Sequence, residues 1–375
     1  METYKLRDLC LTEISDGTHQ TPTYSETGYI FLSSKNVTTG KIDWDNVMYI
    51  PESLHNELYK RIRPQRDDIL LAKNGTTGVA AIVDRDEVFD IYVSLALIRP
   101  DKSKVLPRYL LYAINSTPSK EFFNSNLKGI GVPNLHLKHI RETPIRVPSF
   151  DEQEHIIAVL DKVSNLLEHR KQQIEQLDEL VKSRFIELFG DPNTNPKGWK
   201  KEQLQVNAKL LNGRAYKQDE LLDDGKYPVL RVGNFFSNRG WYYSNLELEE
   251  DKYCDNGDLL YAWSASFGPK IWDGGKVIYH YHIWKVLVGE KYNKQFLCNL
   301  LDYATASFMG DTHGIGMMHL TKSGMEQTEF IVPPIEEQEV FAAFVEQTDK
   351  SKLAVQQSIA ELEELKKSLM QQYFG

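Results

Sequence analysis

Two segments, near residues 150–190 and 335–375, place apolar residues at alternating spacings of three and four. Seven of nine such positions are apolar in the first segment and six of nine in the second. This is heptad spacing, which predicts two long helices that pair with each other. Acidic residues open both segments after a Val-Pro pair, as is typical of a helix N-terminus. The positions are Leu160, Val163, Leu167, Arg170, Ile174, Leu177, Val181, Arg184 and Leu188, then Val345, Thr348, Lys352, Val355, Ile359, Leu362, Lys366, Leu369 and Tyr373.

The remaining parts of the chain alternate short apolar runs with Gly or Asp turns. Asp68–Ala72, Gly78–Val83 and Ile91–Ile98 are rich in branched apolar residues and are predicted as strands. A helix is predicted over Pro107–Asn115. A second block repeats this pattern over Asp258–Trp263, Lys276–Val288 and Lys294–Tyr303.

The chain carries an internal repeat. Gly129-Ile130-Gly131 recurs as Gly314-Ile315-Gly316, and Glu152-Gln153 recurs as Glu337-Gln338. Every such pair is offset by 185 residues without a gap. One register held over about sixty residues indicates a duplication.

The repeat and the helix pattern together predict an α+β fold with two duplicated mixed domains and two long helices. The expected order is a first domain over residues 1–150, a central helix over 151–190, a second domain over 191–335 and a C-terminal helix over 336–375. The breaker-rich stretch Gly190–Gly198 would link the central helix to the second domain.

The charge distribution neither demands nor excludes a nucleic-acid partner. The net charge is −9, but residues 151–190 and 336–375 carry −4 each. The two long blocks are close to neutral and can still present a basic face. Three widely separated cysteines exclude a disulfide framework and a zinc module. No apolar run approaches the ~18 residues of a membrane span, and no secretory signal is visible, so we expect a cytoplasmic protein.

Catalytic motifs are missing from the sequence. It has no Asn/Asp-Pro-Pro-aromatic loop for adenine methylation, no glycine-rich dinucleotide turn and no P-loop. His280 and His282 alternate along a predicted strand, which is more typical of the polar face of a sheet than of a metal site. We therefore expect no catalytic residue, no metal ligand and no cofactor in this chain.

Polar loops that recur in both blocks are the candidates for DNA contact. Lys73–Gly78 lies between two predicted strands and offers a cation and hydroxyls to phosphates, as does Trp263–Lys270. Ser33–Asn36 and Arg231–Asn234 follow earlier strands, where Asn and Arg suit base edges. For each loop, an ordinary polar turn is the alternative. The candidate residues are Ser33, Lys35, Asn36, Lys73, Asn74, Thr76, Thr77, Asn134, His136, Arg231, Asn234, Ser264, Ser266, Lys270, His313 and His319.

Several aromatic residues lie off the predicted helix seam. Phe185, Phe189, Phe341 and Phe344 would leave apolar surface on the helices for a docking partner. The alternative is that these rings pack on the globular blocks of the same chain.

These residues together resemble the DNA specificity subunits of type I restriction–modification systems. The resemblance rests on the duplicated plan, on the loops Gly129–Leu135 and Gly314–Leu320, and on Val147-Pro148 before Glu152-Gln153 with its repeat. It spans essentially the whole chain and adds the Phe185–Gly190 segment followed by Asp191-Pro192.

The resemblance implies two target-recognition domains, each reading one half of a bipartite, asymmetric site in double-stranded DNA. It also implies that the helices pair antiparallel, set the spacer and dock two modification subunits, which are adenine-N6 methyltransferases. Restriction subunits would complete the complex, and S-adenosylmethionine, ATP and Mg would be bound on partner subunits only. The alternative is a coiled-coil protein–protein adaptor without DNA binding, which the acidic balance favours.

Overall fold

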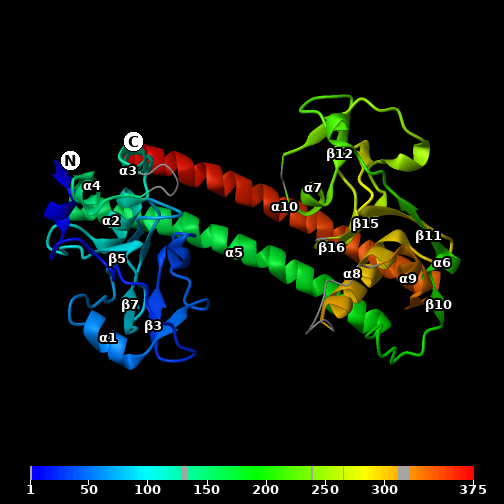
Figure 1. Ribbon diagram of the computed structural model, residues 1–375, viewed down its shortest axis with the longest axis horizontal. Helices are drawn as coiled ribbons and strands as arrows, with labels where there is room; N and C mark the ends of the chain where they lie inside the picture. The colour runs from blue at the N-terminus through cyan, green and yellow to red at the C-terminus, as the bar shows by residue number, and fades with distance from the viewer. Residues whose placement is uncertain (1, 128–133, 238–239, 265, 311–320) are drawn as a thin grey trace. The chain divides into compact units, whose positions relative to one another are not determined.

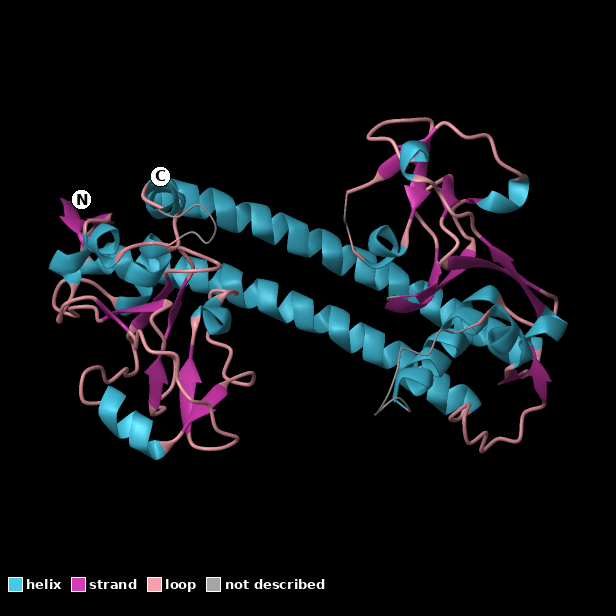
Figure 2. Cartoon of the chain, viewed as in Figure 1, coloured by secondary structure: helices cyan, strands magenta, loops and turns pink. Residues whose placement is uncertain are grey.

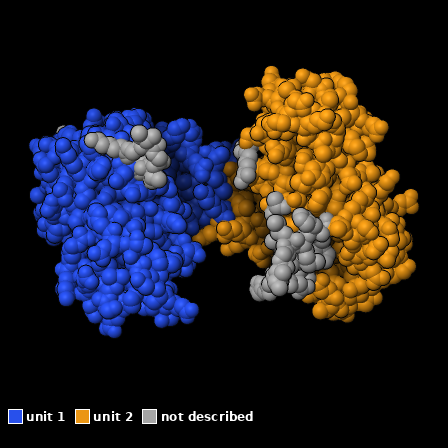
Figure 3. All heavy atoms as spheres, viewed as in Figure 1, with its two compact units in different colours: residues 1–171, 357–375 blue, residues 172–356 orange. Residues whose placement is uncertain are grey.

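The computed structural model describes residues 2–127, 134–237, 240–264, 266–310 and 321–375. The chain forms two compact units: unit 1 contains residues 1–171 and 357–375, and unit 2 contains residues 172–356 (Figure 3). Each unit therefore combines a globular part with one half of each long helix.

Unit 1 contains two sheets and a separate strand pair. The four-stranded sheet has the order β2-β8-β5-β6 and is antiparallel throughout. In the three-stranded sheet, β4-β3-β7, the central strand is antiparallel to β4 and parallel to β7. The strands are β1 (Glu2–Lys5), which pairs with β9 (Pro144–Val147), and β2 (Ser15–Asp16), β3 (Tyr29–Leu32), β4 (Met48–Ile50), β5 (Ile69–Ala72), β6 (Ala80–Ile82), β7 (Phe89–Ile91) and β8 (Leu95–Ile98).

Unit 2 repeats this strand order. Its sheet β11-β18-β15-β16 corresponds to β2-β8-β5-β6, and β13-β12-β17 corresponds to β4-β3-β7 with β14 added at the edge. The parallel pair is also kept, between β12 and β17. The strands are β10 (Lys201–Gln203), which pairs with β19 (Glu329–Ile331), and β11 (Ala208–Asn212), β12 (Tyr227–Leu230), β13 (Tyr242–Ser244), β14 (Tyr253–Cys254), β15 (Leu259–Ser264), β16 (Ser266–Ile271), β17 (Val277–Tyr279) and β18 (Ile283–Val288). The duplication and the α+β class predicted from the sequence are confirmed.

Helices and the smaller sheet cover opposite faces of each four-stranded sheet (Figure 2). In β5, Ile69 and Leu71 pack with α2, whereas Leu70 and Ala72 face the three-stranded sheet. Successive strand residues point to opposite faces, so a strand covered on both sides is apolar throughout. The shorter helices are α1 (Glu52–Leu58), α2 (Pro107–Ile114), α3 (Thr117–Ser125), α4 (Leu137–Arg141), α6 (Leu204–Asn207), α7 (Val232–Phe236), α8 (Lys294–Gly310) and α9 (Lys322–Gln327), with 3-10 turns η1 (Leu6–Leu9), η2 (Ser34–Val37), η3 (Gln218–Glu220) and η4 (Glu250–Lys252).

Two 40-residue helices, α5 (Phe150–Phe189) and α10 (Ile335–Phe374), occupy positions 185 residues apart (Figure 1). All of the predicted seam positions on both helices are buried or half-buried. Of the helices that the described residues form, none is long and apolar enough to cross a membrane.

The helix halves within each unit pair antiparallel. In unit 2, rising residue numbers on α5 meet falling numbers on α10, and the same holds in unit 1. In unit 2, the Asp178 carboxylate lies 2.6 Å from Lys352 Nζ, and the ring centres of Phe185 and Phe341 are 5.4 Å apart. In unit 1, Lys171 Nζ lies 3.5 Å from the Glu363 carboxylate, and Leu160 belongs to the same core as Phe374. The helix pairing expected from the sequence is therefore confirmed.

The structure differs from the sequence prediction at two apolar runs. Ile91–Ile98 and Lys276–Val288 were each predicted as one strand, but each run forms two strands that belong to different sheets. A turn breaks each run, closed by a hydrogen bond from Leu95 N to Tyr92 O in unit 1 and from Ile283 N to His280 O in unit 2, both 2.9 Å. Both strands of each run are mostly buried and apolar, so hydrophobicity alone does not reveal the turn.

Candidate nucleic-acid interface

A short connection carries the chain from the smaller sheet to the larger one in each unit. Residues 92–94 connect β7 to β8 in unit 1, and residues 280–282 connect β17 to β18 in unit 2. A helical turn follows the neighbouring strand, η2 after β3 and α7 after β12. We call each connection, together with this neighbouring turn, a sheet junction.

Matching backbone hydrogen bonds hold the two sheet junctions. The four corresponding bonds have N···O distances between 2.8 and 3.1 Å. They run from Tyr92 N to Leu32 O, Val93 N to Thr18 O, Leu95 N to Tyr92 O and Lys73 N to Ser94 O in unit 1, and from His280 N to Leu230 O, Tyr281 N to Arg214 O, Ile283 N to His280 O and Trp263 N to His282 O in unit 2. The two units therefore share one backbone scaffold at this place.

One glycine in each unit makes the close approach at the junction possible. A Cβ built on Gly17 would lie 1.9 Å from the carbonyl oxygen of Ile91. A Cβ on Gly213 would lie 2.4 Å from the carbonyl oxygen of Tyr279. Neither position accommodates a residue with a side chain, because the neighbouring backbone already occupies that space.

The side chains on this common scaffold differ between the units. The turn after the strand begins with Ser33 in unit 1 and Arg231 in unit 2, and each residue's carbonyl accepts a 2.9 Å bond from an asparagine three positions later. Unit 1 offers hydroxyls and a phenol ring, whereas unit 2 offers guanidinium groups, imidazoles and an indole. The corresponding pairs are Thr18 and Arg214, Ser33 and Arg231, Lys73 and Trp263, Tyr92 and His280, and Ser94 and His282.

The junction of unit 2 borders a cleft of about 670 Å³. The Arg231 guanidinium lies 5.2 Å from the centre of the Tyr242 ring, and Asn234 Nδ2 donates a 3.1 Å hydrogen bond to Gly240 O. Arg214 forms a two-bond ion pair with Glu220 at 2.7 and 2.9 Å. The polar and aromatic side chains that line the cleft are those of Asp223, Arg231, Asn234, Trp241, Tyr242, His280 and His282.

Burial, followed by the neighbouring His282 and Arg231, lowers the pKa of His280 to about 4. His280 is therefore neutral near pH 7, with one ring nitrogen that donates and one that accepts. An arginine, an amide and a neutral imidazole around one cleft match the donors and acceptors that base edges present in the major groove. Within the described ranges, no group of three or more His, Cys, Asp or Glu side chains is placed to hold a metal ion.

A family model described as the type I restriction modification DNA specificity domain matches residues 1–177 and 196–364. The chain belongs to this family. Its two matched segments correspond to the two repeats. Its role is that of a DNA specificity subunit, and the alternative of an adaptor without DNA binding is not favoured.

Relatives named as type I restriction enzyme specificity subunits match this chain over different shares of their length. The putative type I restriction enzyme MjaX specificity subunit of Methanocaldococcus jannaschii is 24% identical, over 98% of this chain and 91% of that protein. The MjaVIII specificity subunit of the same organism is 23% identical, over 83% of this chain and 79% of that protein. The EcoBI specificity subunit of Escherichia coli is 26% identical over 42% of this chain and 35% of its own length.

Two solved structures share the fold. One chain, from a study of complex assembly and conformational transition of the type I R-M system, aligns with a TM-score of 0.58 and 17% identity over 100% of this chain and 97% of its own. The S subunit of a type I restriction-modification system from M. genitalium aligns with a TM-score of 0.55 and 14% identity, covering 98% and 94%.

In unit 1 of this specificity subunit, Lys73 is not a free loop cation. Its side chain is 7% exposed and its ammonium forms an ion pair with the buried carboxylate of Asp16. Burial acts to raise the pKa of Asp16, but hydrogen bonds and charge interactions with Lys73 and His19 outweigh it and hold that pKa below its usual value. The expectation that Lys73 contacts a phosphate is wrong for this arrangement, because the ammonium is already buried and paired.

Asn36 also has a structural role. Its Oδ1 accepts from the backbone N–H of Ser33 at 2.9 Å, and its Nδ2 donates to Asn46 O at 3.0 Å. The side chain is buried, so the expectation that Asn36 reads a base edge is corrected. Lys35, next to it, is exposed.

The other candidates of unit 1 surround the loop after β5. Asn74 and Asn134 form an isolated backbone bridge, which joins that loop to the segment before α4. Thr76 and His136 are exposed, and His136 precedes the first residue of α4. Ser33 and Thr77 are half-buried.

In unit 2, the stretch expected to be a loop over Trp263–Lys270 is largely strand. Ser264 ends β15 and Ser266 begins β16, so both lie at the tip of a tight hairpin. Lys270 lies within β16, 3.2 Å from a carboxylate oxygen of Asp273 and 5.5 Å from the Trp272 ring. Pairing of β16 with β15 gives the backbone N–H and C=O groups of this stretch hydrogen-bond partners within the sheet, whereas in a free loop these groups would bond to water. His313 and His319 lie outside the described residues.

The four helix aromatics do not form a docking surface. Phe185, Phe189 and Phe341 are at most 3% exposed and lie in the core of unit 2, where their rings also contact Phe296 or each other. Phe344 is half-buried, with the Arg184 guanidinium 5.8 Å from its ring centre. The alternative stated from the sequence, that these rings pack on the same chain, is confirmed.

Several junction residues were not among the sequence candidates. They are Thr18, Arg214, Tyr92, His280 and His282. Only backbone hydrogen bonds between segments that are distant in the sequence bring these residues close to the predicted turns. These residues are found by comparing equivalent positions in the structures of the two units. The sequence does not reveal them, because the difference in residue number between equivalent positions changes along the globular parts.

Proposed function

We propose that each unit of this DNA specificity subunit reads one half of a bipartite, asymmetric target through its sheet junction. The supporting observation is that one backbone scaffold carries different side chains in the two units, Ser33 against Arg231 and Tyr92 against His280. Identical side chains would favour two identical half-sites, whereas different donors and acceptors select different bases. Residues 1–150 and 191–335 would be the two target-recognition domains.

Within each domain, residues that line the cleft would read bases, and polar residues outside the cleft would contact phosphates. In unit 2, Arg231, Asn234 and His280 line the cleft and would contact base edges. Lys35 and Thr76 in unit 1, with Ser266 and Lys270 in unit 2, would contact phosphates and position the duplex without reading sequence.

The long helices would dock the modification subunits and set the spacer between half-sites. Leu180 and Leu365 occupy the same position in the two repeats and are 49% and 47% exposed. Two equivalent apolar positions suit two copies of one partner. Methylation and cleavage would then be performed in the cytoplasm by modification and restriction subunits, which would bind S-adenosylmethionine, ATP and Mg.

The test is to co-express the chain with its modification subunits and to map N6-methyladenine across a genome. We expect one bipartite motif with two different halves separated by unspecified bases. Arg231→Ala should relax one position in one half only. A palindromic motif, or relaxation in both halves, would contradict the proposal.

A further inference from the structure

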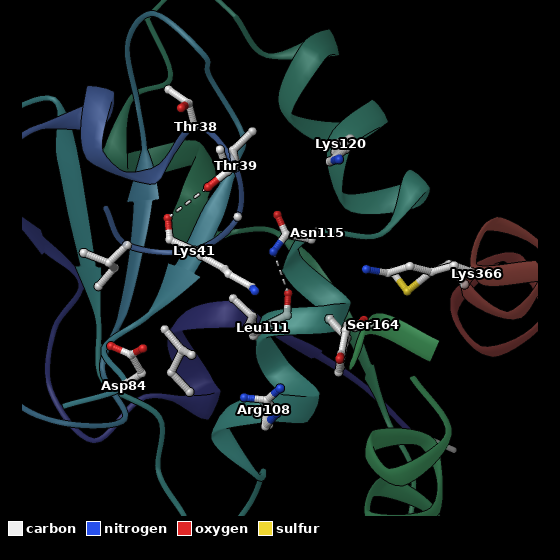
Figure 4. Close-up of a pocket in the computed structure, with 16 residues that line it drawn as sticks. Thr38, Thr39, Lys41, Asp84, Arg108, Leu111, Asn115, Lys120, Ser164 and Lys366 are labelled. Carbon is white, nitrogen blue, oxygen red and sulfur yellow. Dashed lines mark hydrogen bonds between the residues drawn. The ribbon is translucent and has the colours of Figure 1, made fainter. Parts of the chain in front are cut away.

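A second pocket, of about 570 Å³, lies in unit 1 between the segment that follows η2 and the helices α2, α3, α5 and α10. Four cationic side chains line it: Lys41 from the segment before β4, Arg108 from α2, Lys120 from α3 and Lys366 from α10. Figure 4 shows Lys41 and Lys366 pointing toward one another from opposite sides of the pocket. Its volume lies within the range of about 300–1,000 Å³ typical of small-ligand sites.

Two of these four cations are paired with carboxylates. Arg108 Nε lies 2.6 Å from Asp161, and Lys41 Nζ lies 3.0 Å from Glu168. The lining carboxylate of Asp84 accepts a 2.9 Å hydrogen bond from the Trp44 indole. Among the described residues, Lys120 and Lys366 take part in no direct ion pair, although the Asp161 carboxylate, which pairs with Arg108, also acts on the charge of Lys366.

The packing of the two long helices does not require a lysine at position 366. It lies on the apolar seam of α10, and its equivalent 185 residues earlier is Val181, which is buried in the core of unit 2. Burial, followed by the like charges of Lys171, Lys41 and Lys120, lowers the pKa of Lys366. A half-buried seam position that carries an unfavourable charge in one repeat and a buried valine in the other points to a role outside folding.

The floor of the pocket is apolar. Ile42, Val79, Leu111 and Met370 belong to its lining, and Thr38 and Thr39 lie at one side (Figure 4). A ligand that fits would combine a compact anion with a flat apolar body. We propose that this pocket binds a phosphomonoester of nucleotide size, with its phosphate between Lys120 and Lys366 and its ring system on the apolar floor.

The charges of ligand and site match. A phosphomonoester carries about −1.5 to −2 at pH 7, which two unpaired ammonium groups neutralise. A phosphodiester within a nucleic-acid strand carries one negative charge, so it would neutralise only one of the two ammonium groups. The phosphate could belong to a free nucleotide or to the 5′ end of a strand, and the proposal is independent of how the sheet junctions read DNA.

Calorimetric titration of the full chain with 5′-AMP, adenosine, inorganic phosphate and an oligonucleotide with or without a 5′-phosphate tests the proposal. We expect AMP to bind, adenosine to bind at least tenfold more weakly, and bound AMP to raise the thermal unfolding temperature. Tighter binding of the 5′-phosphorylated oligonucleotide than of the unphosphorylated one with the same sequence, lost in K366V, would identify a strand end as an additional source.

The repeat supplies a matched pair of variants. Lys366→Val and Lys352→Leu each replace a seam lysine by the residue at the equivalent position of the other repeat, but Lys352 is paired with Asp178 in unit 2. We expect K366V to weaken AMP binding at least tenfold and K352L to leave it unchanged. Lys120→Gln, an exposed change, tests the same site if K366V does not fold. Equal binding of AMP and adenosine, unchanged binding by K366V or K120Q, or no binding of AMP by the wild-type chain at millimolar concentration would overturn the proposal.

Discussion

Gln153 and Gln338 make the same clamp at the start of the two long helices. Gln153 Nε2 donates to Pro148 O at 3.0 Å, and Gln338 Nε2 donates to Pro333 O at 2.8 Å. The Oε1 of Gln153 accepts a 2.8 Å hydrogen bond from the backbone N–H of Leu106, which precedes α2, and the Oε1 of Gln338 accepts a 2.9 Å bond from that of Asn293, which precedes α8. Both glutamines are almost fully buried. The repeated glutamine thus has a structural cause: it ties each long helix to its own globular part.

Loss of this clamp should destabilise the unit that contains it. Gln153→Met keeps the side-chain size but leaves a buried carbonyl and a buried N–H without partners, at about 1–3 kcal/mol each. We expect a loss of about 2–4 kcal/mol in the free energy of unfolding, measured by urea denaturation. Gln172→Met on the exposed surface of α5 is the control and should change stability by under about 0.5 kcal/mol. Equal effects of the two changes would contradict the role of the clamp.

Lys73 should matter for folding and not for phosphate binding. Lys73→Met leaves the buried Asp16 carboxylate with only the 3.2 Å contact to His19, which should cost up to about 3–5 kcal/mol of stability. The slope of log K for DNA against log salt should stay that of the wild type. Lys35→Ala, at an exposed position, should instead reduce that slope by about one unit without loss of stability. A reduced slope for K73M in folded protein would restore Lys73 as a phosphate contact.

Arg231 and Ser33 occupy equivalent positions on the common scaffold, so exchanging their chemistry should alter half-sites separately. Arg231→Ser should relax one base pair of one half-site, with a cost of about 1–3 kcal/mol in binding. The other half-site should be unchanged, as read from methylation maps or competition binding. The exposed Lys217→Ser is the control, expected to leave both halves as they are. Relaxation of several positions at once would indicate a structural role for Arg231.

The low pKa of His280 makes unit 2 sensitive to acid. Because that pKa is about 4 in the folded chain and about 6.5 when unfolded, the unfolded chain binds more protons between these values. Stability should therefore fall as the pH drops from about 7 to 4, and His280→Gln should flatten this dependence. Urea midpoints at pH 7 and pH 5 measure it, with the exposed His136→Gln as control. An unchanged pH dependence in the His280→Gln variant would show that the imidazole titrates normally.

Leu180 and Leu365 should each contribute to docking one modification subunit. A charge at an exposed apolar position of an interface typically costs several kcal/mol of binding, so Leu180→Asp and Leu365→Asp should each remove one partner from the complex. Mass photometry or light scattering of the co-purified complex measures the stoichiometry. Lys350→Asp, on the exposed surface of α10, is the matched control. Full complexes in both leucine variants would place the docking surface elsewhere.

Most of the architecture could be predicted from periodic and repeated patterns in the sequence. Both long helices begin within one residue of the positions expected from the Val-Pro stops, and the apolar seam faces inward along their length. These features depend on neighbours three, four or seven positions away, so they can be recognised without knowing which distant segments meet. The turn at residues 92–94 could not be recognised in this way, because the strands on both sides of it are buried.

The sequence by itself determined the duplication, the helix pair, the absence of the known catalytic motifs and the family. Tertiary structure alone decided which candidate side chains are free. Lys73 looks like a loop cation until Asp16, 57 residues away, is found beside it, and Phe185 looks like a docking residue until Phe296 covers it. Burial and ion pairing depend on contacts between distant parts of the chain, and a residue's type and local spacing do not specify those contacts.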